Sequence, residues 1–293
     1  ELQRLIVPGL LGAAVLQINV VVSRFLAMAV DDSAVTLLYL SSRLVELPLG
    51  LFTAAAVTVL FPTLSSFATR GDKPGFVAEY SRGLRLIWAV AVPAAIGLVI
   101  LREPIVDLLF RRGNFGMEDV GALGAVIAVM ALAMPFYSLS VFATRGLHAF
   151  KDMKAPMRIA VWAFLSNLVF SLILMWPLGA VGLAAANLLS AMLQSYLLQR
   201  ALARIDAPAF SRARFAPALT RIVAATLAMG VLVYGGWLIV AQLLGQGRLA
   251  DVVAVALLIP IAAFFYLGLL CKSGFEDADL LKQILSRALR RRS

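Results

Sequence analysis

The sequence has almost no cysteine or histidine, the residues that form disulfides and supply most ligands of structural zinc sites. Its 293 residues include one cysteine, Cys271, and one histidine, His148. A disulfide needs two cysteines, and structural metal sites usually need several cysteine or histidine ligands. These absences exclude a disulfide framework and a histidine metal cluster. We expect Cys271 and His148 to be packing residues.

The sequence also lacks the common motifs of enzymes. It contains no GxxxxGK[ST] phosphate loop, no HExxH zinc motif, no GxSxG nucleophile motif and no paired carboxylates within an apolar run. We therefore expect no enzyme activity, no cofactor and no metal. Sodium or the membrane potential stays open as the driving force of a transport process. The net charge of +10 comes without an aromatic and basic stripe, so we expect no nucleic-acid partner.

Charge is scarce and apolar residues are abundant. Only 14% of the residues are charged and 62% are hydrophobic, whereas a soluble domain has about 25% charged residues. A membrane helix needs roughly 20 apolar residues. The apolar runs predict an all-α integral membrane protein with about eight transmembrane helices, at residues 5–30, 35–61, 84–101, 120–142, 156–176, 181–198, 217–244 and 252–271.

The basic residues are distributed unevenly between the two sides of these spans. Twenty of the 26 lysines and arginines lie on the side that holds both termini, four lie on the other side, and Arg24 and Arg43 lie within spans. Cytoplasmic loops of membrane proteins carry an excess of lysine and arginine. We therefore expect a multi-pass protein with both termini of this chain in the cytoplasm.

One basic, non-periodic stretch divides the chain. We expect a six-helix lobe at residues 1–204, a basic cytoplasmic linker at 205–216, a two-helix hairpin at 217–271 and a basic amphipathic tail at the membrane interface at 272–293. The chain begins with Glu1 and not with methionine, and no signal peptide precedes the first span. We therefore expect that N-terminal sequence is missing.

The second span contains two opposite charges, Arg43 and Glu46. A cation at the centre of a membrane helix costs about 2.5 to 3.5 kcal/mol on insertion scales, so such residues usually face a protein interior or a water-filled cavity. At helical spacing Tyr39, Arg43 and Glu46 share one face, and Pro48 interrupts the helix within one turn. Transporters build substrate sites at such broken helices.

Two interpretations of this pair stay open. Arg43 and Glu46 either bind cargo or neutralise each other as a structural pair that staples the helix to a neighbour. The order with arginine before glutamate is the weaker one for a pair on a helix, which speaks against the second interpretation. In the first span, Gln17 and Arg24 lie two turns apart on one face. Arg24 either lines a cavity with Gln17 or extends to the headgroups.

Four segments together resemble a known family. They are residues 16–20 (LQINV), 38–52 (LYLSSRLVELPLGLF), 109–115 (LFRRGNF) and 149–156 (AFKDMKAP). In order and spacing they are similar to the second half of the MurJ (MviN) lipid II flippases, in the multidrug/oligosaccharidyl-lipid/polysaccharide exporter superfamily. The resemblance implies half of a two-lobe, alternating-access transporter whose N-terminal six-helix lobe is missing.

The resemblance implies a function and a set of site residues. The cargo is lipid II, the undecaprenyl-diphosphate-linked peptidoglycan precursor, or a related polyprenyl-diphosphate lipid, moved from the inner to the outer leaflet of the bacterial inner membrane for cell-wall synthesis. Arg43 matches a cavity arginine that meets the diphosphate and Glu46 its neighbour, so the expected substrate-binding residues are Arg43, Arg24, Glu46 and Gln17. The last two spans match a helix pair that forms a groove for the lipid tail. Membrane lipids are further expected partners.

The resemblance also implies an ion site. Ser23, Asn167, Ser171 and Asn187 match positions that bind sodium in some members. The family often has aspartate before arginine where this chain has Ser23 before Arg24 and Ser42 before Arg43. Hard cations favour charged oxygen ligands, so the absence of carboxylates weakens the expected sodium site.

Other functions are compatible with the sequence. One is export of a polysaccharide lipid or a drug by a member of the same superfamily, for which acidic residues should dominate the cavity if the cargo is cationic. Another is a non-transporting membrane scaffold that recruits cell-wall enzymes through its basic loops.

The distribution of basic residues gives the first testable prediction. A topology reporter fused at Arg204 or at the C-terminus should be active in the cytoplasm, and a reporter at Asn114 should be active outside, because twenty basic residues flank one side and four the other. Paired alkaline phosphatase and green fluorescent protein fusions would measure this. Cytoplasmic activity at Asn114 would reverse the topology.

Overall fold

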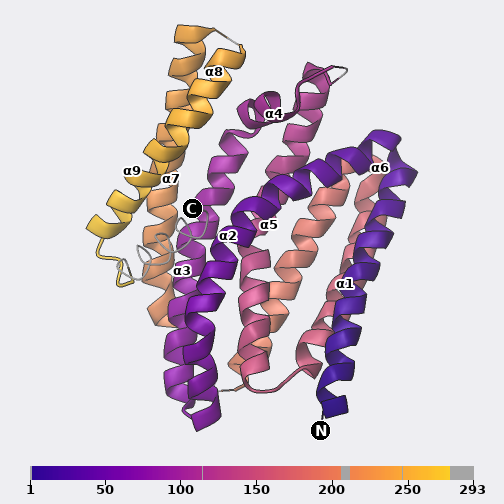
Figure 1. Cartoon of the computed structure of the whole chain (residues 1–293), viewed down its shortest axis with the longest axis vertical. Coiled ribbons are helices and arrows are strands. Elements are labelled where there is room, and N and C mark those ends of the chain that lie inside the picture. The colour runs from indigo at the N-terminus through magenta and orange to yellow at the C-terminus, as the bar shows by residue number, and fades with distance from the viewer. Residues whose placement is uncertain (1, 114, 206–211, 246, 278–293) are drawn as a thin grey trace.

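The computed structural model describes residues 2–113, 115–205, 212–245 and 247–277 (Figure 1). Every regular element in these residues is a helix, which confirms the all-α class. In chain order the elements are α1 (Leu2–Val30), α2 (Asp32–Arg70), α3 (Lys73–Ile100), α4 (Arg102–Phe110), α5 (Met117–Ala149), α6 (Lys154–Ala203), α7 (Arg212–Leu244), α8 (Arg248–Val253), the π-helix η1 (Ala254–Leu258) and α9 (Ile259–Lys272).

The helices have the lengths and the composition of a membrane protein. Among the described residues, five helical segments are long and apolar enough to cross a membrane, and the shorter apolar segment Gln17–Val30 lies in α1; the five are Lys73–Ile100, Met117–Ala149, Lys154–Ala203, Pro217–Leu244 and Arg248–Lys272. The eight expected spans fall in α1, α2, α3, α5, the two halves of α6, α7 and the continuous α8–η1–α9 segment. The expected membrane fold is therefore confirmed.

Helix α6 contains two spans because it reverses at Gly179. This residue has φ 58° and ψ −134°, a conformation that glycine adopts without the steric cost of a Cβ atom. The reversal brings the two halves of α6 side by side, so that Asn167 Nδ2 lies 3.0 Å from Asn187 Oδ1. The connection between the spans expected at 156–176 and 181–198 thus depends on the non-helical conformation of one residue.

The bounds of α2 and α3 differ from those predicted. We expected the second span to end near Pro62, but α2 continues through this proline to Arg70. A proline removes a single backbone donor, and the hydrogen-bond ladder resumes after it. The helix ends instead at Gly71, whose φ of 72° suits a left-handed cap. Helix α3 begins at once, with the Asp72 carboxylate accepting from the Gly75 amide at 2.9 Å.

The helices form two groups on either side of α5. Helix α5 packs against α2, α3, α4 and α6, and α1 packs along α6 on one side of the molecule (Figure 1). On the other side α7 packs on α3, α9 on α7, and α8 on α4. The pair formed by α7 and α8–η1–α9 therefore lies across the lobe from α1. Helix α7 begins within the segment expected to be a linker, of which residues 206–211 lie outside the described residues.

The largest apolar core holds α2, α3 and α5 together. Tyr80 stacks on Phe142 with their ring centroids 5.0 Å apart, and both side chains are fully buried. The Tyr80 hydroxyl donates to Gln199 Oε1 at 3.0 Å, so this polar group is satisfied within the core. Gly83 lies beside Phe142 and leaves the room that the ring occupies. The core thus depends on a close approach of α3 to α5.

The chain that follows α9 is fixed to the first turns of α3. The carboxylate of Asp277, 6% exposed, accepts from Arg82 Nε at 2.9 Å and from Arg85 Nε at 2.8 Å. Arg221 of α7 donates to the Gly274 carbonyl at 2.8 Å. The tail predicted at residues 272–293 is described only as far as Asp277, and its amphipathic stretch lies outside the described residues. These contacts anchor the C-terminal helix pair to α3.

The close approach at Gly83 gives a stability prediction. In Gly83→Ala the new Cβ would lie 2.6 Å from Phe142 Cε1 and 3.0 Å from Leu60 Cδ1, so α3 and α5 must separate. Overpacking of this kind costs about 1 to 3 kcal/mol, and the thermal unfolding temperature in detergent should fall. Gly97→Ala in the same helix is the control, since no atom lies within 4 Å of its added Cβ. An equal change in both variants would contradict the packing argument.

Candidate functional site

The charged face of α2 carries an exposed ion pair within an apolar helix. Arg43 Nη1 lies 3.1 Å from Glu46 Oε2, and the two side chains are 60% and 57% exposed. The Arg43 Cζ atom lies 5.1 Å from the centroid of the Tyr39 ring, which is within the range of a cation–π contact. The glutamate and the ring therefore hold the guanidinium from two sides while much of it stays accessible.

This pair does not join α2 to another helix in the described part of the chain. The partners of Arg43 there, Tyr39 and Glu46, both belong to α2. A pair that served to staple two helices would be buried between them, whereas both of these side chains are more than half exposed. The structure therefore gives no support, within these residues, to the interpretation as a staple between helices.

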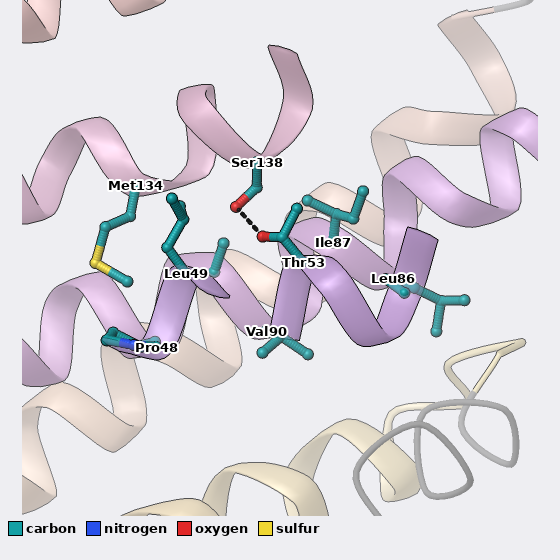
Figure 2. A pocket seen from close by; sticks show the side chains of 11 residues that line it. Pro48, Leu49, Thr53, Leu86, Ile87, Val90, Met134 and Ser138 are labelled. Carbon is teal, nitrogen blue, oxygen red and sulfur yellow. Dashed lines mark hydrogen bonds between the residues drawn. The ribbon is translucent and has the colours of Figure 1, made fainter. Parts of the chain in front are cut away.

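Pro48 does not interrupt α2 as the sequence predicted, because the helix continues through it with one backbone hydrogen bond missing. Pro48 cannot donate to the Leu44 carbonyl, so one rung of the hydrogen-bond ladder is missing two residues after Glu46. Figure 2 shows the small cavity at this point, about 20 Å³ in volume, with Pro48, Leu49 and Thr53 of α2 on one side and Met134 and Ser138 of α5 on the other.

One buried hydrogen bond crosses this cavity. Thr53 Oγ1 and Ser138 Oγ lie 2.9 Å apart, and both residues are buried. The α3 wall of the cavity includes Ala91 and Ala94, which flank Pro93, and the α5 wall includes Met134, next to Pro135. Three neighbouring helices therefore each carry a proline near this cavity. Prolines are the usual sites of helix bends, so this level is where the lobe can flex.

The expected substrate residues of α1 lie on its exposed face. Gln17 and Arg24 are both exposed, and in the part of the chain that the structure describes Arg24 forms no ion pair. Phe25, beside it, is 67% exposed. The structure thus places Gln17 and Arg24 on one helix and Arg43 and Glu46 on another, without a polar contact between the two sets among the described residues.

A larger cavity lies between α1, α5 and α6. Its volume is about 630 Å³, within the usual size range of ligand pockets, and Leu49 of α2 also reaches its wall. Among the described residues no acidic side chain lines it, while Arg145 and His148 supply basic groups. Its other polar lining residues are Asn19, Tyr137, Ser140, Thr144, Asn167, Asn187, Ser190 and Gln194. The cavity therefore offers hydrogen bonds and positive charge, which suits a polar neutral or anionic group.

Two of the four expected ion-site residues meet in this cavity. Asn167, 3% exposed, donates from Nδ2 to Asn187 Oδ1 at 3.0 Å. Ser171 is buried and Ser23 is half-buried, and neither lines the cavity. The Asn187 oxygen already accepts a hydrogen bond, and the set has no carboxylate, so these residues fit sodium poorly. Among the described residues no three His, Cys, Asp or Glu side chains form a metal site.

The spacing of polar residues along α5 and α6 is a feature of the sequence that indicates this cavity, although we did not predict it. Asn187, Ser190 and Gln194 recur at helical spacing along the second half of α6, and Ser140 and Thr144 do so along α5. Isolated polar residues at a spacing of three or four in apolar helices indicate a polar face directed into the bundle. Tyr137 and Arg145 extend the same face of α5.

A family model described as "Lipid II flippase MurJ" matches residues 1–254. The chain belongs to the lipid II flippase MurJ family. This is the family that the four segments indicated, and its members are transporters rather than enzymes, as we expected. With its apolar helices, membership identifies the chain as a multi-pass protein of the bacterial inner membrane.

Relatives with this family name cover most of the chain. The protein described as probable lipid II flippase MurJ of Haemophilus influenzae is 35% identical over 240 residues, which are 80% of this chain and 47% of that protein. The corresponding protein of Bdellovibrio bacteriovorus is 30% identical over 276 residues, 94% of this chain and 52% of that protein. The chain thus spans about half the length of these MurJ relatives.

Solved structures show the same fold. A lipid II flippase MurJ in an inward closed conformation has a TM-score of 0.74 at 24% identity, over 92% of this chain and 53% of that chain. An outward-facing multidrug resistance transporter of the MATE family, in the MOP superfamily, has a TM-score of 0.60 at 16% identity, over 98% and 67%. At these identities the likeness concerns the fold alone.

The direct Asn167–Asn187 contact leads to a prediction about sodium. Replacing sodium chloride by potassium chloride at equal concentration should leave the thermal unfolding temperature unchanged, because no carboxylate is present to bind the ion. Ser171→Asp, four residues from Asn167 on α6, is the positive control. It should lower the unfolding temperature in potassium and regain part of the loss in sodium. Sodium-specific stabilisation of the unsubstituted chain, which bound ligand confers by mass action, would contradict this prediction.

Proposed function

We propose that this chain forms the second lobe, with the lipid-facing helix pair, of a flippase that moves lipid II from the inner to the outer leaflet. The observation that carries the proposal is the exposed Arg43 and Glu46 pair on an apolar helix that contains a proline two residues after Glu46. Its placement in a chain of the MurJ family supports a diphosphate lipid as the cargo.

Arg43 has the chemistry needed to hold a diphosphate. Its guanidinium can donate two parallel hydrogen bonds to phosphate oxygens, and such charge-assisted contacts are stronger than neutral ones. Tyr39 limits the motion of the guanidinium, and Glu46 competes with the phosphate for the same donors. Binding therefore exchanges one anionic partner for another, and release reverses the exchange. Gln17 and Arg24 of α1 supply further donors in the proposed central site.

The cavity between α1, α5 and α6 suits the glycan and peptide portion of the cargo. Its lining is rich in amides and hydroxyls, and the lining residues that the structure describes include no acidic one. Leu49 lies three residues after Glu46 on α2 and forms part of its wall, so the cavity reaches the level of Pro48 below the ion pair. In this proposal, a cargo held by its diphosphate at Arg43 extends its glycan and peptide into the cavity, toward Asn187, Gln194 and Arg145.

The exposed faces of α1 and α2 suit a second lobe as their partner. Ile18, Phe25 and Met28 are large apolar residues with more than half of their surface exposed, close to the polar Gln17 and Arg24. The chain covers about half of its relatives' length, and the flippase MurJ structure extends well beyond the matched part. We place the missing six-helix lobe against this face, and alternating access opens the shared cavity to each side in turn.

The remaining domains take their roles from position and composition. Residues 1–204 form the transport lobe, 205–216 a cytoplasmic linker, 217–271 the helix pair that holds the polyprenyl tail, and 272–293 an interfacial tail, with both termini cytoplasmic. Exposed apolar residues along the helix pair, among them Val231, Leu243 and Phe264, support its contact with lipid chains. The Arg82, Arg85 and Asp277 contacts place the start of the tail beside α3.

The fold is also compatible with export of a drug or a polysaccharide lipid, because MATE transporters share it. A cationic drug would require acidic residues where it binds, and none is found among the described lining residues of the large cavity. The lining therefore favours the diphosphate lipid over a cationic cargo.

Arg43 provides the test of this function. With a first lobe supplied, Arg43→Ala should lower the rate of lipid II flipping by roughly 100-fold or more, and Arg43→Lys by roughly 10-fold, since each charge-assisted contact contributes about 1.5 to 3 kcal/mol. Stability should stay near that of the unsubstituted protein, because an exposed ion pair contributes only about 0 to 1 kcal/mol. A vesicle assay with fluorescent lipid II would measure the rate.

A matched control separates this role from a general effect of charge. Arg102 also pairs with a neighbouring glutamate, with its Nη2 atom 3.2 Å from Glu103 Oε1, and Arg102→Ala should leave flipping unchanged. The double variant Arg43→Leu, Glu46→Leu removes the pair without leaving one charge alone. Normal flipping by this double variant would overturn the proposed role of Arg43.

A further inference from the structure

Tyr266 of α9 reaches across to the backbone of α3. Its side chain is buried, with the residue 4% exposed, and its hydroxyl donates to the Ala89 carbonyl oxygen at 2.8 Å. Helix α9 itself packs mainly on α7 and η1, and α7 packs on α3. Tyr266 is therefore a long side chain that carries a polar contact from the last helix past α7 into the lobe.

The carbonyl that Tyr266 meets is one that its own helix cannot satisfy. In a regular α-helix the Ala89 carbonyl accepts from the amide of residue 93, and here residue 93 is a proline without an N–H group. A buried backbone carbonyl without a donor is costly, most of all in a membrane, where water cannot replace the missing donor. The Tyr266 hydroxyl supplies the hydrogen bond that Pro93 removes.

Other contacts hold the C-terminal helix pair to α3 and α4 on both sides of this break. Before Pro93, Arg82 and Arg85 pair with Asp277. After it, Gly230 of α7 packs against Ile96 and Ile100 of α3, where an added Cβ would lie 3.5 and 3.4 Å from these side chains. The pair thus contacts α3 before the bend, at the bend and after it. Bending at Pro93 cannot occur without moving these contacts relative to one another.

We infer that Tyr266 is a positioning residue that couples the α7–α9 pair to the proline bend of α3. While the Tyr266 hydroxyl donates to the Ala89 carbonyl, bending of α3 at Pro93 is restricted. The α7–α9 pair then moves together with α3. The consequence for transport rests on the proposed function: the coupling makes the helix pair that contacts the lipid tail move together with the cavity that holds the rest of the cargo. Loss of the hydroxyl should let the helix pair and the lobe move independently.

The test is a double-substitution cycle in the full chain. Tyr266→Phe removes the hydroxyl and keeps the ring, and Pro93→Ala restores the amide that the Ala89 carbonyl needs. Tyr266→Phe should lower the unfolding temperature by about 2 to 4 °C, as expected for one buried hydrogen bond. In the Pro93→Ala background the same substitution should lower it by less than about 1 °C. An equal loss in both backgrounds would show that Tyr266 acts through packing alone.

A distance measurement reads the coupling directly. Spin labels at Glu103 of α4 and Phe264 of α9, both exposed, are introduced after Cys271→Ser removes the native thiol. Tyr266→Phe should broaden the distance distribution in the Pro93 protein and leave it unchanged in the Pro93→Ala protein. A distribution that Tyr266→Phe leaves unchanged with Pro93 present would overturn the inference. Pro93→Leu, which also restores the amide, is used if Pro93→Ala does not fold.

Two matched controls and a transport assay complete the experiment. Tyr234→Phe changes an exposed tyrosine of α7 and should change neither the unfolding temperature nor the distance distribution. Pro135→Ala restores a backbone amide in α5 instead of α3, and it should leave the effect of Tyr266→Phe intact. With a first lobe present, Tyr266→Phe should slow flipping of a long-chain lipid several-fold more than that of a short-chain analogue. Equal slowing would overturn the link to the lipid tail. The distance readout needs no cargo, so it separates failure of the coupling from failure of the proposed function.

Discussion

The backbone carbonyls freed by proline are the constraint on which this lobe depends. In a membrane each backbone donor and acceptor must find a partner within the protein, because lipid offers none. Pro48, Pro93 and Pro135 each remove one backbone donor from one of three adjacent helices around one small cavity. At Pro93 the Tyr266 hydroxyl supplies the missing donor to the Ala89 carbonyl. Beside the cavity, the Thr53–Ser138 hydrogen bond joins α2 to α5. The missing backbone hydrogen bonds at these prolines make this level of the helices the one where bending is easiest.

Helix α5 separates two environments that the proposed transport cycle needs. One of its faces, with Ser140, Thr144 and Arg145, borders the polar cavity. Another face, with Phe142 and Leu147, belongs to the apolar core shared with α3. Polar surface therefore lies toward α1 and α6, and the apolar helix pair lies beyond α3. In the proposed function, the polar and apolar parts of the cargo would contact these two separate surfaces.

Sequence patterns predicted the elements better than the contacts between them. The apolar runs located the spans because twenty apolar residues without charge have few alternatives to a membrane helix, and the cost of Arg43 in such a run singled out α2. The end of α2 was wrong because Pro62 reads as a stop locally, while the helix continues to a glycine that can adopt a positive φ. The Asn167–Asn187 pairing depends on how Gly179 folds α6 back. The contact of Tyr266 with Ala89 joins residues 177 positions apart and leaves no periodic signal.

The anchoring of the chain's last described residues to α3 sets an order of assembly. Asp277 follows Arg85 by 192 positions, so these partners cannot meet until the last helix has been synthesised. At about 5 to 20 residues per second this interval lasts roughly 10 to 40 s. During that time α3 can pack against α2 and α5, while Arg82 and Arg85 await their carboxylate. Closing these ion pairs is thus a late step, which follows the synthesis of α9.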